Sequence, residues 1–150
     1  MNNERKSLSA RQYLGQLEVI DTKVQQKLEE LETLMIGACG INGIDYSKDR
    51  VQTSSAGDTV GNAVTRYVSL NEEINAEIDE FADIKHKVIK EIQSLNNSNY
   101  IKVLFKVYVQ YKSLKATADD MGISYQHVRN IHKKALEEFE TMYSDLHYLT

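Results

Sequence analysis

The chain has 150 residues, 22 of them acidic and 18 basic, and carries a net charge of −4 without any proline. This length allows one domain or two small ones, and no run approaches the roughly 18 apolar residues that a membrane span needs. The first residues are polar, so no secretory signal is expected. The single cysteine, Cys39, has no internal disulfide partner, which fits a reducing environment. We therefore expect a cytoplasmic protein with no membrane partner.

A first amphipathic helix is predicted from about residue 9 to residue 38. Its apolar residues recur at steps of three and four, which indicates one buried stripe. The stripe consists of Leu14, Leu17, Ile20 or Asp21, Val24, Leu28, Leu31 and Met35. The main loop is predicted over residues 40–57, because five of the seven glycines fall between Gly37 and Gly61 and the Asn42-Gly43 pair is typical of a turn.

A second long amphipathic helix is predicted to begin near Asp58. Its stripe consists of Val60, Val64, Tyr67, Ile74, Ile78, Phe81, Val88, Ile92 and Leu95. Neither long helix can bury its stripe alone, so the sequence favours a long antiparallel helical hairpin with coiled-coil-like contact. We expect this hairpin to form a domain over residues 1–96.

A shorter helix is predicted over residues 100–109. The polar run Asn96-Asn97-Ser98-Asn99 is expected to end the second helix and to cap this third one. Leu104 and Phe105 are expected to point inward, with Val107 or Tyr108 beside them. Tyr108 and Tyr143 are interpreted as residues that line a small core.

The segment 114–139 scans as two helices joined by a sharp turn. Ala118 supplies the small side chain needed where the second helix crosses the first, and Gly122 tolerates the positive φ of the turn. Ser124 is placed to cap the second helix, while Met121, Ile123, Val128 and Ile131 close a miniature core. This register is that of a helix-turn-helix. The fold predicted is therefore all-α, with the hairpin followed by a three-helix module over residues 97–150.

The second helix of this module is predicted to turn polar and basic residues outward. Arginine can fork onto guanine, and asparagine or glutamine can pair with adenine, whereas lysine suits phosphate. The candidate DNA-binding residues are Tyr125, Gln126, His127, Arg129, Asn130, Lys133 and Lys134. Two other interpretations stay open. An ordinary solvated helix could have the same face, and Arg129 could instead form an ion pair with Asp119 or Asp120.

The charge is divided along the predicted boundary. Residues 1–96 hold 11 basic against 16 acidic residues, a net charge of −5, and residues 97–150 hold 7 against 6, a net charge of +1. A net charge of +1 is a weak basic footprint for a DNA-binding module, so nonspecific affinity should be modest. Dimerisation through the hairpin, or docking on a larger protein complex, would then supply the missing affinity for DNA.

Residues typical of catalysis or of metal binding are scattered. The four histidines do not cluster, the acidic pairs Asp119-Asp120 and Glu137-Glu138 diverge on their helices, and no nucleophile or phosphate-binding motif occurs. We therefore predict that the protein is not an enzyme and needs no metal or cofactor.

The segment also resembles region 4 of the sigma-70 family of RNA polymerase sigma factors. The matching residues are Leu114, Ala118, Met121, Gly122, Ser124, Val128, Arg129, Ile131, Lys134, Ala135 and Leu136. Thr117 departs from the pattern, where an apolar residue is usual, and implies a looser first helix. In layout, with its opening Ala10-Arg11-Gln12-Tyr13-Leu14, the chain is similar to short phage-encoded, sigma-like regulators of Gram-positive bacteria and their prophages.

The resemblance implies a DNA-binding transcriptional regulator that reads double-stranded promoter DNA in contact with RNA polymerase. Nothing before residue 97 looks like the helix with which a complete sigma factor opens a promoter, so opening is not expected from this chain alone. Two alternatives remain. One is a small terminase-like protein that recognises phage DNA for packaging, and the other is a helical protein-interaction scaffold.

Overall fold

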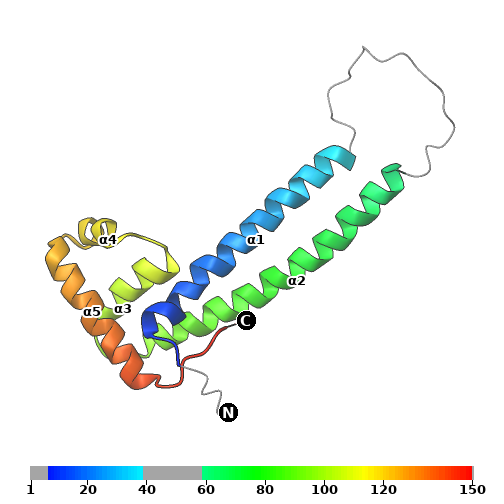
Figure 1. Ribbon diagram of the computed structural model, residues 1–150. Coiled ribbons are helices and arrows are strands. Elements are labelled where there is room, and N and C mark those ends of the chain that lie inside the picture. The colour runs from blue at the N-terminus through cyan, green and yellow to red at the C-terminus, as the bar shows by residue number, and fades with distance from the viewer. Residues whose placement is uncertain (1–6, 39–58, 150) are drawn as a thin grey trace, which may run out of the picture. The chain divides into compact units, whose positions relative to one another are not determined.

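The computed structural model describes residues 7–38 and 59–149, and every regular element in these residues is a helix (Figure 1). The predicted all-α class is confirmed. The elements are α1 (Ala10–Ala38), α2 (Thr59–Gln93), α3 (Ser98–Leu104), the π-helical turn η1 (Phe105–Val109), α4 (Leu114–Met121) and α5 (Tyr125–Met142). The predicted loop at 40–57 and Cys39 lie outside the described residues.

The described residues fall into two compact units, which differ from the predicted domains. The larger unit contains residues 7–21 and 81–149, and the smaller unit contains residues 22–38 and 59–80. This division does not follow the boundary expected after residue 96. The first turns of α1 and the last turns of α2 bury their apolar side chains in the same core as α3, η1 and α5.

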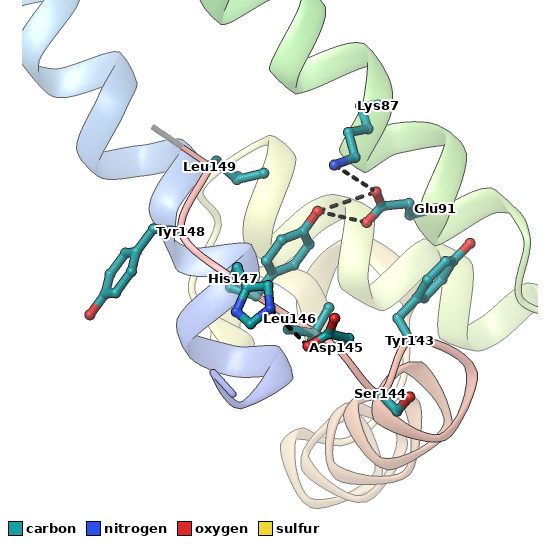
Figure 2. Close-up of a pocket in the computed structure, with 10 residues that line it drawn as sticks. Lys87, Glu91, Tyr143, Ser144, Asp145, Leu146, His147, Tyr148 and Leu149 are labelled. Carbon is teal, nitrogen blue, oxygen red and sulfur yellow. Dashed lines mark hydrogen bonds and ion pairs between the residues drawn. The ribbon is translucent and has the colours of Figure 1, made fainter. Parts of the chain in front are cut away.

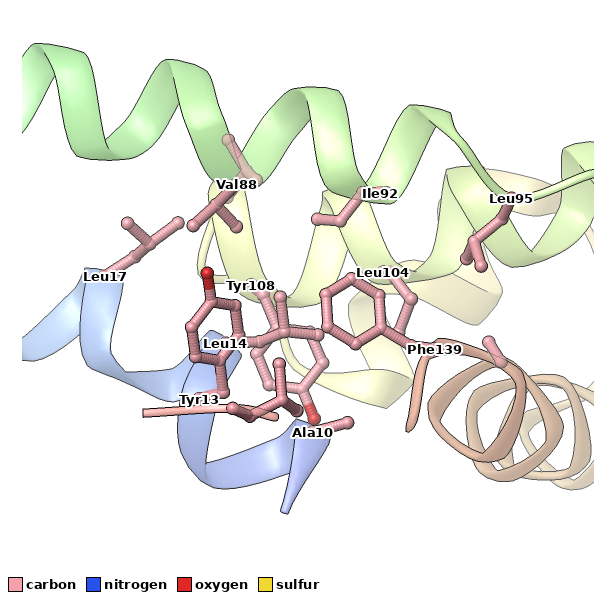
Figure 3. Close-up of a cluster of buried hydrophobic side chains, with 13 residues drawn as sticks. Ala10, Tyr13, Leu14, Leu17, Val88, Ile92, Leu95, Leu104, Tyr108 and Phe139 are labelled. Carbon is pink, nitrogen blue, oxygen red and sulfur yellow. The ribbon is translucent and has the colours of Figure 1, made fainter. Parts of the chain in front are cut away.

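The core of the larger unit collects side chains from segments that are far apart in the sequence (Figure 3). Phe139 of α5 is fully buried there, with its ring centroid 6.0 Å from that of Tyr13 and 4.9 Å from that of Tyr143. Burying a large apolar side chain stabilises the folded state by about 1.5–3 kcal/mol. The buried members are Ala10, Tyr13, Leu14, Leu17, Val88, Ile92, Leu95, Leu104, Tyr108, Val109, Ala135, Phe139 and Leu146.

The start of α1 is capped twice. The Ser9 and Gln12 side chains each accept a hydrogen bond from the other's backbone N–H, at 3.3 and 3.1 Å, which is a capping box. The backbone N–H of Ala10 donates to Glu140 Oε1 at 2.7 Å. A carboxylate at this position also interacts favourably with the positive end of the helix dipole. The beginning of α1 is therefore fixed against α5.

The residues after α5 return to the start of α1. The backbone N–H of Leu8 donates to the Leu146 carbonyl at 2.8 Å, and that of Leu149 donates to Gln16 Oε1 at 2.8 Å. The Leu146 side chain is buried in the core. The C-terminal segment 143–149 is thus held by hydrogen bonds along its length as well as by an apolar contact.

A second, smaller hydrophobic core of the larger unit lies between α3, α4 and α5. It consists of Val103, Ala118, Val128 and Ile131, with Leu114, Met121 and Ile123 packed against it. Gly122 ends α4 with φ 65° and ψ 32°, the left-handed conformation expected at this turn. The Ser124 hydroxyl caps α5 by accepting the N–H of His127 at 3.1 Å.

Thr117 is fully buried at the position where the resemblance expects an apolar residue. Its hydroxyl donates to the Ser113 carbonyl, four residues earlier, at 2.9 Å. A buried polar group costs free energy chiefly when it lacks a partner, and this one has a partner inside its own helix. The threonine that replaces the usual apolar residue at position 117 is therefore accommodated in the core without leaving its hydroxyl unpaired.

The segment predicted as a single helix over 100–109 changes form partway. Asn97 caps α3, as expected, by accepting the N–H groups of Asn99 and Tyr100. From Phe105 onward the chain widens into η1, and Tyr111 then takes a positive φ of 57°. This conformation is uncommon for a residue other than glycine, and the Tyr111 hydroxyl donates to the Leu17 carbonyl at 3.4 Å. The inward expectation holds for Leu104 and Tyr108, which are buried, whereas Phe105 and Val107 are only partly covered.

In the smaller unit, α1 and α2 are joined by apolar and charged contacts. Val24 and Ile74 are buried. The Lys27 ammonium donates to the carboxylates of Glu73, at 3.2 Å, and Glu77, and these hydrogen bonds raise the pKa of Lys27. Pairs this exposed to solvent contribute little to stability, so apolar burial is the main stabilising contact of this unit.

Replacing Gly122 with alanine should destabilise the protein through its backbone alone. An added Cβ would meet no atom within 4 Å, but φ 65° costs a residue with a Cβ about 1–2 kcal/mol. We expect the free energy of unfolding, measured by urea denaturation, to fall by this amount in Gly122→Ala. Gly122→Asn should lose less, because asparagine tolerates this conformation. An alanine variant as stable as the wild type would contradict the turn described.

Candidate nucleic-acid interface

The outward face of α5 holds all the candidate DNA-binding residues. Val128, Ile131, Ala135 and Phe139 are buried at steps of three and four, which leaves the intervening positions outward. The seven residues expected to contact DNA are all exposed, and Tyr125 exposes 49% of its surface. They are Tyr125, Gln126, His127, Arg129, Asn130, Lys133 and Lys134.

The first half of α5 carries positive charge only. The range Tyr125–Lys134 contains three basic and no acidic residues. The Ser124 cap satisfies one backbone N–H at the start of this helix, and the smaller core holds its first turns through Val128 and Ile131. A rigid helix therefore presents amide, imidazole, guanidinium and ammonium groups from one surface.

Arg129 makes no ion pair with any residue that the structure describes. Asp120, one of its two proposed partners, is instead bound by Lys112 and by Lys106, the latter at 3.3 Å. Hydrogen bonds from these two lysines lower the pKa of Asp120. The alternative left open above, an ion pair of Arg129 with Asp119 or Asp120, is therefore not found among the described residues, and Lys106 and Lys112 bind Asp120 instead.

The guanidinium of Arg129 lies over the ring of Tyr125, with its carbon 5.9 Å from the ring centroid. Residues four apart lie on the same side of a helix, and a cation above an aromatic face is attracted to it. Because the side chain of Arg129 makes no hydrogen bond or ion pair with any residue that the structure describes, its N–H groups stay available. The geometry suits a side chain that is oriented in advance for a hydrogen-bonding partner.

His132 differs from its neighbours on α5 because it turns toward the core. Its Nε2 lies 2.9 Å from the Tyr108 hydroxyl, and the two rings stack with centroids 5.7 Å apart. Burial lowers the pKa of His132, and the positive charge of Arg11 lowers it further. Burial also raises the pKa of Tyr108 to about 12. Burial therefore favours a neutral imidazole, which shares a hydrogen bond with the Tyr108 hydroxyl, a contact that sequence reasoning did not find.

A pocket lies where the C-terminal segment passes α1 and α2 (Figure 2). On one side the Tyr13 hydroxyl donates to Glu91 at 2.9 Å, and Lys87 approaches the same carboxylate at 3.8 Å. Burial and the Glu91 contact raise the pKa of Tyr13. Asp145 and His147 pair with each other at 2.8 Å. The charged groups of this pocket are thus paired with one another, because Tyr13 and Lys87 contact Glu91, and Asp145 contacts His147.

Neither a metal site nor a membrane helix is found in the part of the chain that the structure describes. No group of three or more His, Cys, Asp and Glu residues there could hold a metal ion. None of the helices there combines the length and the apolar character needed to cross a membrane. Comparisons with protein-family models, with curated proteins and with solved structures find no match for this chain.

The buried state of His132 predicts a specific dependence of stability on pH. Its folded-state pKa lies below the ordinary value of 6.5, so the unfolded chain binds protons more readily as pH falls. The contribution of His132 to stability is therefore complete above pH 6.5 and is lost as pH falls below it. We expect wild-type protein to lose more free energy of unfolding between about pH 7.5 and 5.5 than His132→Gln. Glutamine keeps a hydrogen-bonding side chain but does not titrate. Equal losses in urea denaturation would contradict this account.

Proposed function

We propose that the protein is a sequence-specific DNA-binding regulator of transcription that uses α4 and α5 as a helix-turn-helix. The observation that carries this proposal is the exposed and acid-free surface over Tyr125–Lys134. It is presented by a helix whose opposite side is anchored in two cores. The resemblance of this segment to sigma region 4 supports the same interpretation and favours promoter DNA of a phage or prophage as the target.

The residue types on this surface divide into base readers and phosphate contacts. The proposed base readers are exposed in the first turns of α5, where recognition helices usually meet base edges, and they are Gln126, His127, Arg129 and Asn130. Arginine can donate two hydrogen bonds to guanine, and glutamine or asparagine can pair with adenine. Lys133 and Lys134 follow one turn later and suit the phosphates at the edge of the groove.

Affinity for DNA should depend on a second contact. The segment 97–150 has a net charge of only +1, and nonspecific affinity grows with the number of phosphates neutralised. We propose that α1 and α2 form an antiparallel hairpin that supplies this contact, either as a homodimer interface or as a docking surface for RNA polymerase. Exposed apolar side chains in the smaller unit, Met35, Ile36, Val64 and Val68, favour a protein contact there.

The same apolar side chains are the observation that favours the scaffold alternative. A scaffold would use the outward surface of α5 for protein contacts and would bind no DNA at any salt concentration. The DNA-packaging alternative requires a stable ring oligomer. Light scattering on the purified protein separates it from a regulator, since a monomer or dimer would exclude the ring.

Arg129→Ala should relax sequence preference and weaken binding to the preferred site. One good base contact contributes about 1–3 kcal/mol of discrimination. We expect a selection from random short duplexes, near physiological salt, to enrich a motif with the wild type and to lose it with the variant. Thermal stability should be unchanged, because Arg129 has no ion pair among the described residues.

The matched control is Arg66→Ala. Arg66 is exposed on α2 in the smaller unit, and the substitution removes the same charge. This variant should keep both the enriched motif and the affinity. If Arg66→Ala and Arg129→Ala weakened binding equally without changing the motif, Arg129 would not be a base reader. If the wild type enriched nothing, even with added RNA polymerase, the proposed function would be wrong.

A further inference from the structure

The first turn of α1 lies against the second half of α5. Ala10 is fully buried, and its N–H donates to Glu140 of α5 at 2.7 Å. One turn later the ring of Tyr13 contacts that of Phe139. These contacts bring residues 130 positions apart in the sequence to one surface. The beginning of α1 is therefore part of the same rigid unit as the proposed recognition helix.

Arg11 is exposed beside this junction. It forms no ion pair within the described ranges, 7–38 and 59–149. Its charge acts on His132, whose pKa it lowers, and on Tyr108, to which His132 is hydrogen-bonded. Ala10 and Leu14, on either side of Arg11 in the first turn of α1, are buried in the same core as Tyr108, and the Tyr108 hydroxyl lies 2.9 Å from His132 Nε2. The first turn of α1, and Arg11 with it, therefore lies near the flank of α5 that His132 occupies. His132 immediately precedes Lys133, so this flank borders the proposed DNA-binding surface.

The position of this flank relative to Lys134 matters for a DNA duplex. Successive residues of a helix are separated by about 100°, so His132 and Lys134 are about 200° apart around α5. Arg11 and Lys134 consequently lie on opposite flanks of the helix, with Arg129, Asn130 and Lys133 between them. A helix in the major groove, which is about 12 Å wide, has a phosphate strand on each side.

Local electrostatics leave Arg11 available for a phosphate. Glu140 is the acidic residue of α5 that contacts the first turn of α1, and it accepts the Ala10 N–H rather than binding Arg11. An arginine with an unpaired guanidinium can donate two parallel hydrogen bonds to phosphate oxygens. A basic residue on α1 would also add to the weak positive charge of residues 97–150.

We infer that Arg11 is a phosphate-contacting residue, which binds the DNA backbone on the flank of α5 opposite Lys134. This inference rests on the proposed function and extends the interface from the helix-turn-helix to the first turn of α1. Arg11 would strengthen binding to every duplex, whatever its sequence, because a phosphate contact carries no base information. In this respect its role differs from that of Arg129.

The test is the salt dependence of DNA binding. The affinity of wild type, Arg11→Ala, Arg11→Lys and Arg66→Ala is measured by fluorescence anisotropy over a range of salt concentrations. Two duplexes are used, one with the selected motif and one with a scrambled sequence.

We expect Arg11→Ala to weaken binding to both duplexes by the same factor. The slope of log K against log salt should fall by about 0.9, the value for one phosphate contact. Arg11→Lys should restore most of the slope, and Arg66→Ala should behave as the wild type.

Several results would overturn the inference. It is wrong if Arg11→Ala keeps the wild-type slope, or if it changes the preferred motif as Arg129→Ala does. If Arg11→Ala loses affinity only because it unfolds, its melting temperature falls. Arg11→Gln, which keeps a long side chain without the charge, would then bind like the wild type, and the inference would be wrong. If the wild type binds neither duplex at low salt, even with added RNA polymerase, the proposed function and this inference both fail. If the wild type binds and only the slope prediction fails, the proposed function stands without Arg11.

Discussion

The shared core around Phe139 is the constraint on which the rest of the larger unit depends. The helices α3 and α4 have only 7 and 8 residues, and isolated helices shorter than about 12–15 residues are marginal in water. They are stable here because Val103 and Leu104 of α3 and Ala118 of α4 pack into cores that α5 also enters. The first turns of α1 and the last turns of α2 complete the larger core. The surface of α5 is therefore positioned by the whole unit, including segments far away in the sequence.

The polar residues around this core satisfy one another and leave the outward surface of α5 free. Asp120 is bound by two lysines, Glu140 by the backbone at the start of α1, and the Thr117 hydroxyl by the Ser113 carbonyl. Each would otherwise compete for a cation or remain unsatisfied. The side chain of Arg129 makes no hydrogen bond or ion pair among the described residues, so its N–H groups are available, as the proposed base-reading role requires.

Sequence periodicity and capping rules predicted the helices well, but they did not predict the contacts between residues far apart in the sequence. Periodicity placed the first helix at residues 9–38, where α1 spans Ala10–Ala38, and the rules for caps and turns identified Gly122 and Ser124. The Ser9-x-x-Gln12 capping box was a readable signal that was missed. By contrast, the bond from Ala10 to Glu140 and the stacking of Tyr108 on His132 join separate helices, and no spacing within one helix reveals them. The outward residues of α5 were predictable, whereas the proximity of Arg11 was not.

The most direct test of the central claim, that the outward face of α5 binds DNA, is an NMR titration of the ¹⁵N-labelled protein with a short duplex. The account predicts that the largest changes in amide chemical shift fall within Tyr125–Lys134. Smaller changes are expected at the start of α1, and none in the smaller unit. Changes confined to the smaller unit, or no changes at low salt with the duplex in large excess, would contradict it.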